Sequence, residues 1–343
     1  MAIGDRLKMA RYASGLSMRA LGALADLSAQ AISKYERNLD TPGSSALVRL
    51  SKALGVRPEF FFRPAAIAVS VSANRAHPCI SKKASEAIVE QAREVLERSV
   101  ELEDLFAGQL SSPPFPADLR IRIQAIERVE DAAEQLRGEW GLGLDPISNL
   151  TAAAEDHGIR VVLVEGSLDF DACIVQSSEL GPVVVLKKGV PGDRQRFSLA
   201  HELGHLLLMI AQGVDHEAAC NRFAGAFLVP RERVRKELGA SRDSLGLGEL
   251  ELLKVKYGLS MQSWIHRAQE AGVLSERQAK RQLQEFKRNG WKIAEPGAQV
   301  PPEETMRTNL LVERALAEGL ITRSRAAELA GKPLSVEFKG HAW

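Results

Sequence analysis

The clearest chemistry in the chain belongs to the pentapeptide His201-Glu202-Leu203-Gly204-His205. On a helix, residues four apart project from one face, so both imidazoles reach the same point. Two imidazole nitrogens placed this way suit a single zinc ion. Glu202, beside the first histidine, would stay unliganded and act as the general base toward an attacking water molecule. The spacing therefore predicts a zinc-dependent hydrolytic site.

A catalytic zinc ion needs a third protein ligand. The residues that follow the pentapeptide offer four candidates, Asp215, His216, Glu217 and Cys220. Glu217 is preferred because it alone begins an E-x-x-x-N spacing on a predicted helix. Asn221, one turn further along the same face, is placed to hydrogen-bond a ligating histidine. Cys220 is interpreted as a small buried apolar residue rather than a ligand.

Strands and helices on either side must position these side chains. Runs of β-branched residues bounded by glycine or proline predict strands at 159–164 and 183–186, with a third at 171–176. The helix with the two histidines comes next, and another helix is predicted from about Asp215 to Leu228. The rest of the chain is predicted to be mainly helical.

The first 63 residues, here called the head, are expected to form several short helices. Ser17 and Ser28 are suited to cap the second and third helices, and Gly55 to end the fourth. Arg11 and Glu36 are expected to form an ion pair inside the head. Ten Lys/Arg and five Asp/Glu give the head a charge of +5, whereas the whole chain is only +1. Such a basic segment on an acidic body is typical of a protein that meets nucleic acid through one part.

Between the head and the predicted strands, the composition and periodicity of the sequence change several times. Residues 64–84 are small and weakly periodic, which predicts a linker, and 85–107 predict an amphipathic connecting helix. The Ser-Pro-rich segment 111–116 predicts a break, and a helix is expected from about 118 to 140. We therefore expect four parts: the head at 1–63, a linker and connecting helix at 64–117, a peptidase domain at 118–290 and a small helical segment at 291–343.

Composition narrows the class of protein. The chain has 343 residues, 45% of them hydrophobic and 26% charged, as in ordinary globular proteins. Three cysteines without a CxxC spacing argue against a disulfide framework and favour a reducing cytoplasm. The first residues lack a signal peptide, and the most apolar stretch, Leu206–Ala211, is too short to span a bilayer. We expect a cytoplasmic protein with no membrane partner.

Three segments together resemble the ImmA/IrrE family of metallopeptidases: RQRFSLAHELGH at 194–205, NRFAGAFLVP at 221–230 and LSMQSWIHRA at 259–268. The resemblance covers about residues 120–275. It implies a gluzincin-like zinc site, a small sheet whose edge strand, near 183–186, receives an extended peptide, and single cleavage of a repressor or antitoxin partner. One residue departs from the expected pattern, because His266 stands where we would expect a tyrosine. It would either stabilise an oxyanion or be a partly exposed helix residue.

The head resembles the phage-repressor (Cro/C1, or XRE) type of helix-turn-helix, through GLSMRAL at 15–21 and LSAQAISKYER at 27–37. The resemblance implies that the third helix lies in the major groove of double-stranded DNA, with Ile32 in the core of the head. The family usually has a glutamine at the position of Met18, so one phosphate contact is lost. Dimeric binding to two half-sites is expected. The candidate DNA-binding residues are Arg19, Ala29, Gln30, Ser33, Lys34, Arg37 and Asn38.

The expected fold is therefore α+β, with an all-α helix-turn-helix domain followed by a mostly helical, gluzincin-like peptidase domain that contains a small β-sheet. The preferred function is a DNA-binding transcriptional regulator fused to a site-specific zinc endopeptidase. Two alternatives differ in class. One is a regulator that uses the peptidase fold only as a sensor or interaction module, and the other is an antitoxin-like component.

Overall fold

The computed structural model describes residues 3–62, 67–71, 81–106, 110, 119–166 and 170–331. The chain folds into two compact units. The first consists of residues 1–111, 162–185 and 307–343, and the second of residues 112–161 and 186–306. The domain boundaries expected from the sequence stay predictions, because these units group segments that are distant along the chain. The break expected at 111–116 lies outside the described residues.

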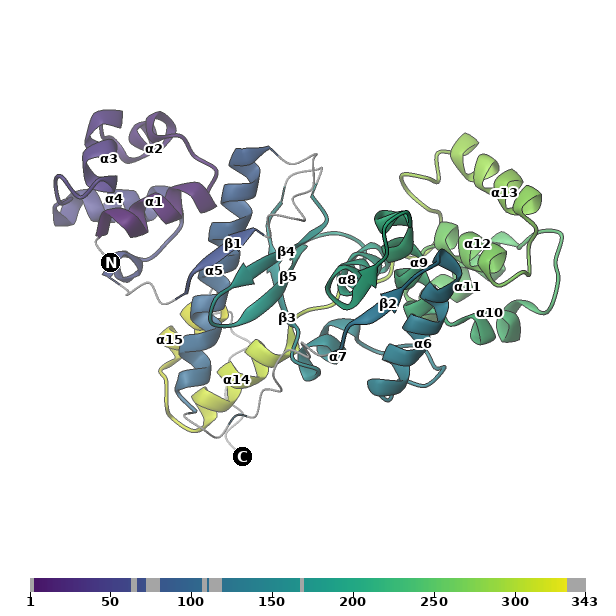
Figure 1. Ribbon diagram of the computed structural model, residues 1–343. Helices are drawn as coiled ribbons and strands as arrows, with labels where there is room; N and C mark the ends of the chain where they lie inside the picture. Colours follow the sequence, from purple (N-terminus) through teal and green to yellow (C-terminus); the bar gives the residue numbers. More distant parts are fainter. Residues whose placement is uncertain are drawn as a thin grey trace. The chain divides into compact units, whose positions relative to one another are not determined.

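The first unit contains the head, a four-stranded sheet and a long helix (Figure 1). Its helices and strands are α1 (Ile3–Ala13), α2 (Met18–Ala25), α3 (Ala29–Glu36), α4 (Ser44–Leu54), the 3-10 helix η1 (Pro58–Phe62), β1 (Val69–Val71), α5 (Lys82–Asp104), β3 (Arg160–Val164), β4 (Ala172–Ser177), β5 (Gly181–Lys187), α14 (Met306–Ala317) and α15 (Arg323–Ala330).

Local sequence signals set the ends of the helices in the head. The hydroxyls of Ser17 and Ser28 accept hydrogen bonds from backbone N–H groups three residues on, at 3.1 and 3.0 Å, which confirms both predicted caps. Gly55 ends α4 with a φ of 67°, in the left-handed region. Gly22 allows the turn between α2 and α3 to close, because a Cβ there would lie 2.5 Å from the carbonyl oxygen of Leu27.

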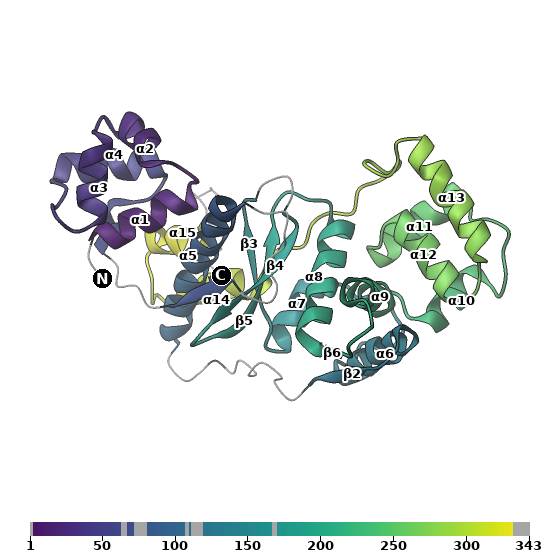
Figure 2. The same ribbon diagram turned by 45° about the horizontal axis from the view of Figure 1, so that its top comes forward.

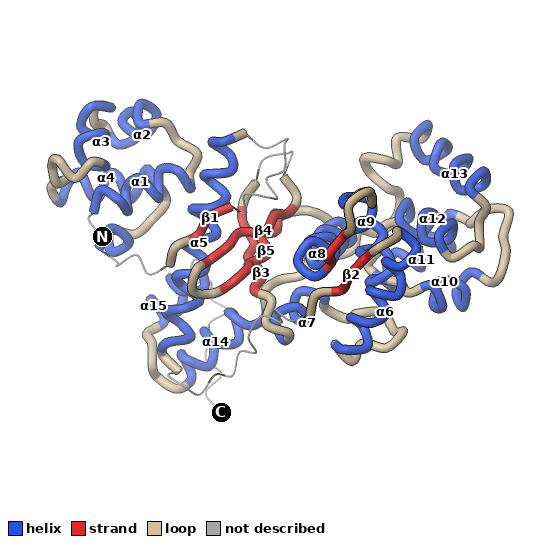
Figure 3. The backbone as a smooth tube through the Cα atoms, in the orientation of Figure 1, coloured by secondary structure: helices blue, strands red, loops and turns tan. Residues whose placement is uncertain are grey.

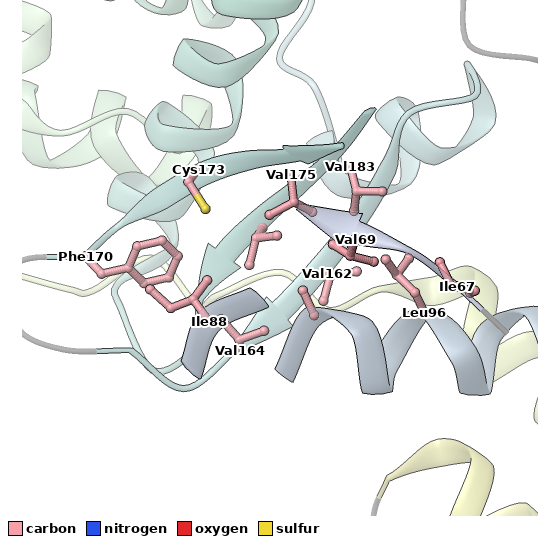
Figure 4. Close-up of a cluster of buried hydrophobic side chains, with 12 residues drawn as sticks. Ile67, Val69, Ile88, Leu96, Val162, Val164, Phe170, Cys173, Val175 and Val183 are labelled. Carbon is pink, nitrogen blue, oxygen red and sulfur yellow. The ribbon is translucent and has the colours of Figure 1, made fainter. Parts of the chain in front are cut away.

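The sheet of the first unit has the strand order β1-β4-β5-β3, and β1 pairs antiparallel with β4. The prediction of a linker over 64–84 is therefore wrong where β1 lies. Ile67 and Val69 are buried and alternate with exposed neighbours, which is the period of a strand. Helix α5 packs on this sheet, and Figure 4 shows its Ile88 and Leu96 among the sheet side chains Val164, Val175 and Val183.

Strand β5 lies between β4 and β3. The prediction that residues 183–186 form an edge strand is therefore wrong. All four of these side chains are at most 1% exposed, as expected of a strand that is covered on both faces.

Helix α5 also joins the head and the C-terminal helices within the first unit. Arg6 of α1 and Glu97 of α5 form a buried ion pair at 2.5 Å. Leu102 and Phe106 pack with Leu311 and Val312 of α14. The connecting helix predicted at 85–107 is thus a scaffold for three parts of this unit.

The second unit carries the pentapeptide with the two histidines. Its elements are β2 (Ile121–Ile123), the 3-10 helix η2 (Ile126–Arg128), α6 (Val129–Glu139), α7 (Leu150–Asp156), α8 (Gly192–Leu207), β6 (Leu208–Ile210), α9 (His216–Leu228), α10 (Arg231–Leu238), α11 (Leu247–Tyr257), α12 (Met261–Glu270) and α13 (Glu276–Arg288).

Strands β2 and β6 form a separate parallel pair (Figure 3). The helix expected from about 118 to 140 is therefore wrong at its start, where Ile121–Ile123 are a strand and α6 begins only at Val129. Ile121 pairs with Leu208, 87 positions later in the chain, so the local sequence pattern does not predict this strand. None of the helices in the described part of the chain has the length and apolarity needed to cross a bilayer.

Candidate metal centre and nucleic-acid interface

Helices α8 and α9 lie side by side, and their contact brings the candidate ligands together (Figure 2). Gly204 makes this approach possible. A Cβ at Gly204 would lie 3.3 Å from both the Cα of Cys220 and a ring carbon of Phe223. Even a methyl group there would be tighter than most Cβ contacts, so its neighbours on α9 would have to shift by a few tenths of an ångström. The glycine of the pentapeptide thus sets the distance between the histidines of α8 and the residues of α9.

Ligand atoms of three side chains converge between these helices. His201 Nε2 and His205 Nε2 are 2.9 Å apart, and they lie 3.3 and 3.4 Å from Glu217 Oε2 and Oε1. Ligand atoms at about 2.0 to 2.1 Å from one tetrahedral ion lie about 3.3 to 3.4 Å apart. The two distances to Glu217 equal this spacing, whereas the two imidazole nitrogens, 2.9 Å apart, would have to separate slightly around one zinc ion. Glu217 is 64% exposed, so the group opens to solvent on that side.

Asn221 fixes the ring of the first histidine. Its Oδ1 lies 3.0 Å from His201 Nδ1. An oxygen acceptor there favours a proton on Nδ1, which leaves the Nε2 lone pair for a metal ion. Asn221 therefore lies where the sequence predicted a hydrogen-bonding partner for a ligating histidine.

The other candidates near the pentapeptide are placed differently. Glu202 follows His201 on α8 and is 3% exposed. Asp215 caps α9, because its Oδ1 accepts a hydrogen bond from Ala218 N at 3.0 Å, so its carboxylate has a structural role. His266 is exposed on α12, and among the described residues it forms no hydrogen bond or ion pair. The structure does not bring His266 into the group of converging ligand atoms.

From the sequence alone, His216 and Cys220 are alternatives to Glu217 as the third ligand of one metal ion. The structure instead groups both with His205, as a second set of side chains that could hold a metal ion. This set faces the other ring nitrogen, Nδ1, which lies 3.5 Å from Cys220 Sγ. The sequence could not separate the two sets, because all five side chains occupy neighbouring turns of the same two helices.

The predicted recognition helix α3 presents polar side chains outward. Gln30 and Lys34 are exposed, as is Ala29, whereas Ser33 is half-buried. Ile32 is 0% exposed and belongs to the core of the head, as predicted. Arg19, near the start of α2, and Arg37, directly after α3, are also exposed.

Two residues outside α3, Asn38 and Met18, have side chains that are not simply placed to contact phosphate. Asn38 has a φ of 54°, and its Oδ1 accepts a hydrogen bond from Gly4 N at 3.0 Å. That side chain therefore links the end of α3 to the start of α1. Met18 is 36% exposed at the first position of α2.

A buried ion pair links α1 to the predicted recognition helix α3. Arg11 Nε and Nη2 donate to Glu36 Oε1 and Oε2 at 2.5 and 2.8 Å, and both residues are buried. The hydrogen bond with Glu36 raises the pKa of Arg11 above its ordinary value, although burial acts in the opposite direction. The predicted internal pair of the head is confirmed.

Comparison with known proteins assigns both regions. Residues 7–61 match a family model described as helix-turn-helix, and residues 154–269 match a peptidase-family model described as IrrE N-terminal-like domain. An uncharacterized HTH-type transcriptional regulator, y4wC, of Sinorhizobium fredii is 33% identical over 60 residues. The match covers 18% of this chain and 42% of that protein, so the chain spans less than half of that relative's length.

A solved structure of a Mycobacterium tuberculosis transcriptional regulator is 20% identical, with a TM-score of 0.31 over 49% of this chain and 51% of that chain. The matches to the two family models, together with the α+β architecture, agree with the resemblance found in the sequence. The chain therefore combines an N-terminal helix-turn-helix domain of the DNA-binding type with a domain of the IrrE-like peptidase family.

Proposed function

We propose that this chain is a transcriptional regulator joined to a zinc-dependent, site-specific endopeptidase. One observation carries the proposal: ligand atoms of His201, His205 and Glu217 converge at separations of 2.9 to 3.4 Å. When bound, a zinc ion at these ligands supplies Lewis-acid chemistry toward a peptide carbonyl and a water molecule. Two imidazoles and one carboxylate suit zinc best among the common divalent ions.

Glu202 is the proposed catalytic residue. It is adjacent to a zinc ligand, it is not one of the three converging side chains, and burial keeps it out of bulk solvent. Its carboxylate accepts the proton of the attacking water and then delivers it to the leaving amine. His201 is held by Asn221, so the direction of its ring does not depend on substrate. An oxyanion role for His266 stays a proposal without a supporting contact.

The proposed substrate is one partner protein, a repressor or a component of a toxin-antitoxin pair, cut once in the cytoplasm. The resemblance to the ImmA/IrrE family supports this narrow specificity. The residues around 183–186 are not the docking strand, because β5 is internal to its sheet. Specificity is proposed to come from docking of the partner, so casein and other generic substrates should be cut poorly.

The helix-turn-helix domain is proposed to bind an operator as a homodimer, on two half-sites about one helical turn apart. The exposed Gln30 and Lys34 and the +5 charge of residues 1–63 support this role. Gln30 would read adenine through two hydrogen bonds, while Lys34 contacts bases or phosphate.

The test of peptidase function compares protein fragments by mass spectrometry in the native host. Strains would express the wild type, Glu202→Gln or, as a matched control, Lys34→Ala, which leaves the metal group intact. At least one fragment should depend on Glu202, and its rate of formation should fall about 100- to 10,000-fold in the glutamine variant. If wild type and Glu202→Gln give identical fragments under every stress applied, the protein is a regulator without peptidase activity.

A further inference from the structure

His205, His216 and Cys220 form a second cluster of ligand-type side chains. Cys220 Sγ lies 3.5 Å from His205 Nδ1 and 3.9 Å from His216 Nδ1. The two imidazole rings are stacked, with centroids 5.0 Å apart and planes at 15°. All three ligand atoms lie within 4.8 Å of one another. Their approach is set by Gly204, the residue that lets α8 and α9 come together.

The separation of His205 Nδ1 and Cys220 Sγ matches that of two ligand atoms on one metal ion, and the longer distance from His216 Nδ1 would shorten on binding. An imidazole nitrogen and a thiolate sulfur bound to the same tetrahedral zinc ion lie about 3.5 Å apart. His205 and Cys220 are buried, whereas His216 is exposed, so an ion would enter from the side of His216. A cysteine interpreted from the sequence as a small apolar residue thus lies against two imidazole nitrogens.

His205 belongs to both clusters, but through different nitrogens. Its Nε2 faces His201 and Glu217, and its Nδ1 faces Cys220. A neutral imidazole carries one proton and therefore offers one free lone pair. A neutral His205 that binds an ion through Nδ1 carries its proton on Nε2, so the two clusters compete for the neutral ring.

The two ligand sets also differ in softness. A thiolate with two imidazoles selects thiophilic ions such as Cd²⁺ or Cu⁺, whereas the carboxylate set suits a harder ion. We propose that His205, His216 and Cys220 form a second metal site for a thiophilic ion, which withdraws His205 from the first site. On binding, the thiol of Cys220 loses its proton to solvent and its sulfur becomes a ligand. The inhibitory consequence rests on the proposed function, but the site itself does not.

The test uses the full chain, stripped of metal and titrated with CdCl₂, and records the ultraviolet charge-transfer band of a cadmium-thiolate bond. The wild type should show the band at one equivalent. The matched control is the double variant Cys79→Ala/Cys173→Ala, which keeps Cys220 as the last of the three cysteines and should show the same band.

Cys220→Ser should lack the band. His216→Ala, at an exposed position, should weaken Cd²⁺ binding about 100-fold because one of three ligands is lost. Absence of the band in the wild type, its persistence in Cys220→Ser, or unchanged affinity in His216→Ala would each overturn the site.

Glu217→Gln separates this proposal from the proposed function. It removes a ligand of the first site alone, so its cadmium-thiolate band should remain. Loss of the band in Glu217→Gln would mean that the two clusters are not separate sites, which overturns the proposal. A band that behaves as expected, in a protein without peptidase activity, would leave the second site standing and remove only its inhibitory role.

Discussion

Helix α3, the predicted recognition helix, and the candidate metal centre use polar side chains in opposite ways. In the head, the charged pair Arg11 and Glu36 is buried and structural, whereas Gln30 and Lys34 face solvent. Between α8 and α9, the side chains with chemistry point toward each other, and His201, His205 and Glu217 converge on one point. The head thus presents polar side chains outward, as a surface for the proposed DNA partner requires, and the candidate metal centre gathers them around one point.

This difference predicts which property a substitution should alter in each region. A change inside the head should destabilise it without altering its chemistry, and a change on its surface should alter binding without affecting stability. In the candidate metal centre, the proposed ligands are also the side chains that touch each other, so single changes should alter metal affinity first.

The largest expected effect is on stability of the head. Arg11→Ala leaves Glu36 buried without its partner and should cost about 3 to 5 kcal/mol. Hydrogen exchange across residues 3–62 would measure the loss. Arg128→Ala is the matched control, because its pair with Asp131 is 73% and 58% exposed and should contribute at most about 1 kcal/mol. Equal protection of the head in Arg11→Ala and wild type would show that this pair is not structural.

The second-largest expected effect is on the zinc affinity of the candidate metal centre. Asn221→Ala removes the acceptor for His201 Nδ1 and should weaken zinc binding about 10- to 100-fold. Competition with a chromophoric chelator gives the affinity. Asn221→Asp keeps an oxygen acceptor at the same place and should restore most of it. An alanine variant with wild-type affinity would mean that Asn221 does not orient the ring.

The smallest effects belong to the surface of α3. Gln30→Ala should lose about 1 to 3 kcal/mol of discrimination at one base pair. Lys34→Ala should instead weaken binding to all sequences and lower the slope of log K against log salt by about one. Binding to operator and scrambled duplexes at several salt concentrations separates the two. If neither variant changes DNA binding, α3 is not the recognition helix.

The sequence predicts those features that depend on neighbouring residues. The caps at Ser17 and Ser28 are decided within one helical turn. The convergence of His201 and His205 follows from a spacing of four on one helix. The long strand runs at 159–164 and 183–186 are apolar enough to be recognised alone.

The features that the sequence does not predict depend on contacts between residues that are distant along the chain. Val69 pairs with Ser177, and Ile121 with Leu208, so the local sequence predicts a linker where β1 lies and a helix where β2 lies. The interior place of β5 depends on the order of all four strands, which its own residues do not specify. Which nitrogen of His205 faces Cys220 likewise depends on how α8 and α9 pack.

The central claim is that His201, His205 and Glu217 hold one zinc ion, and zinc stoichiometry measured by mass spectrometry tests it most directly. All variants would carry Cys220→Ser, so that the second cluster could not substitute for the first. We expect about one zinc ion per chain in this background and with Glu202→Gln, because Glu202 is not a ligand. The addition of His201→Ala and Glu217→Ala should abolish stoichiometric zinc. Full zinc retention in that last variant would contradict the site.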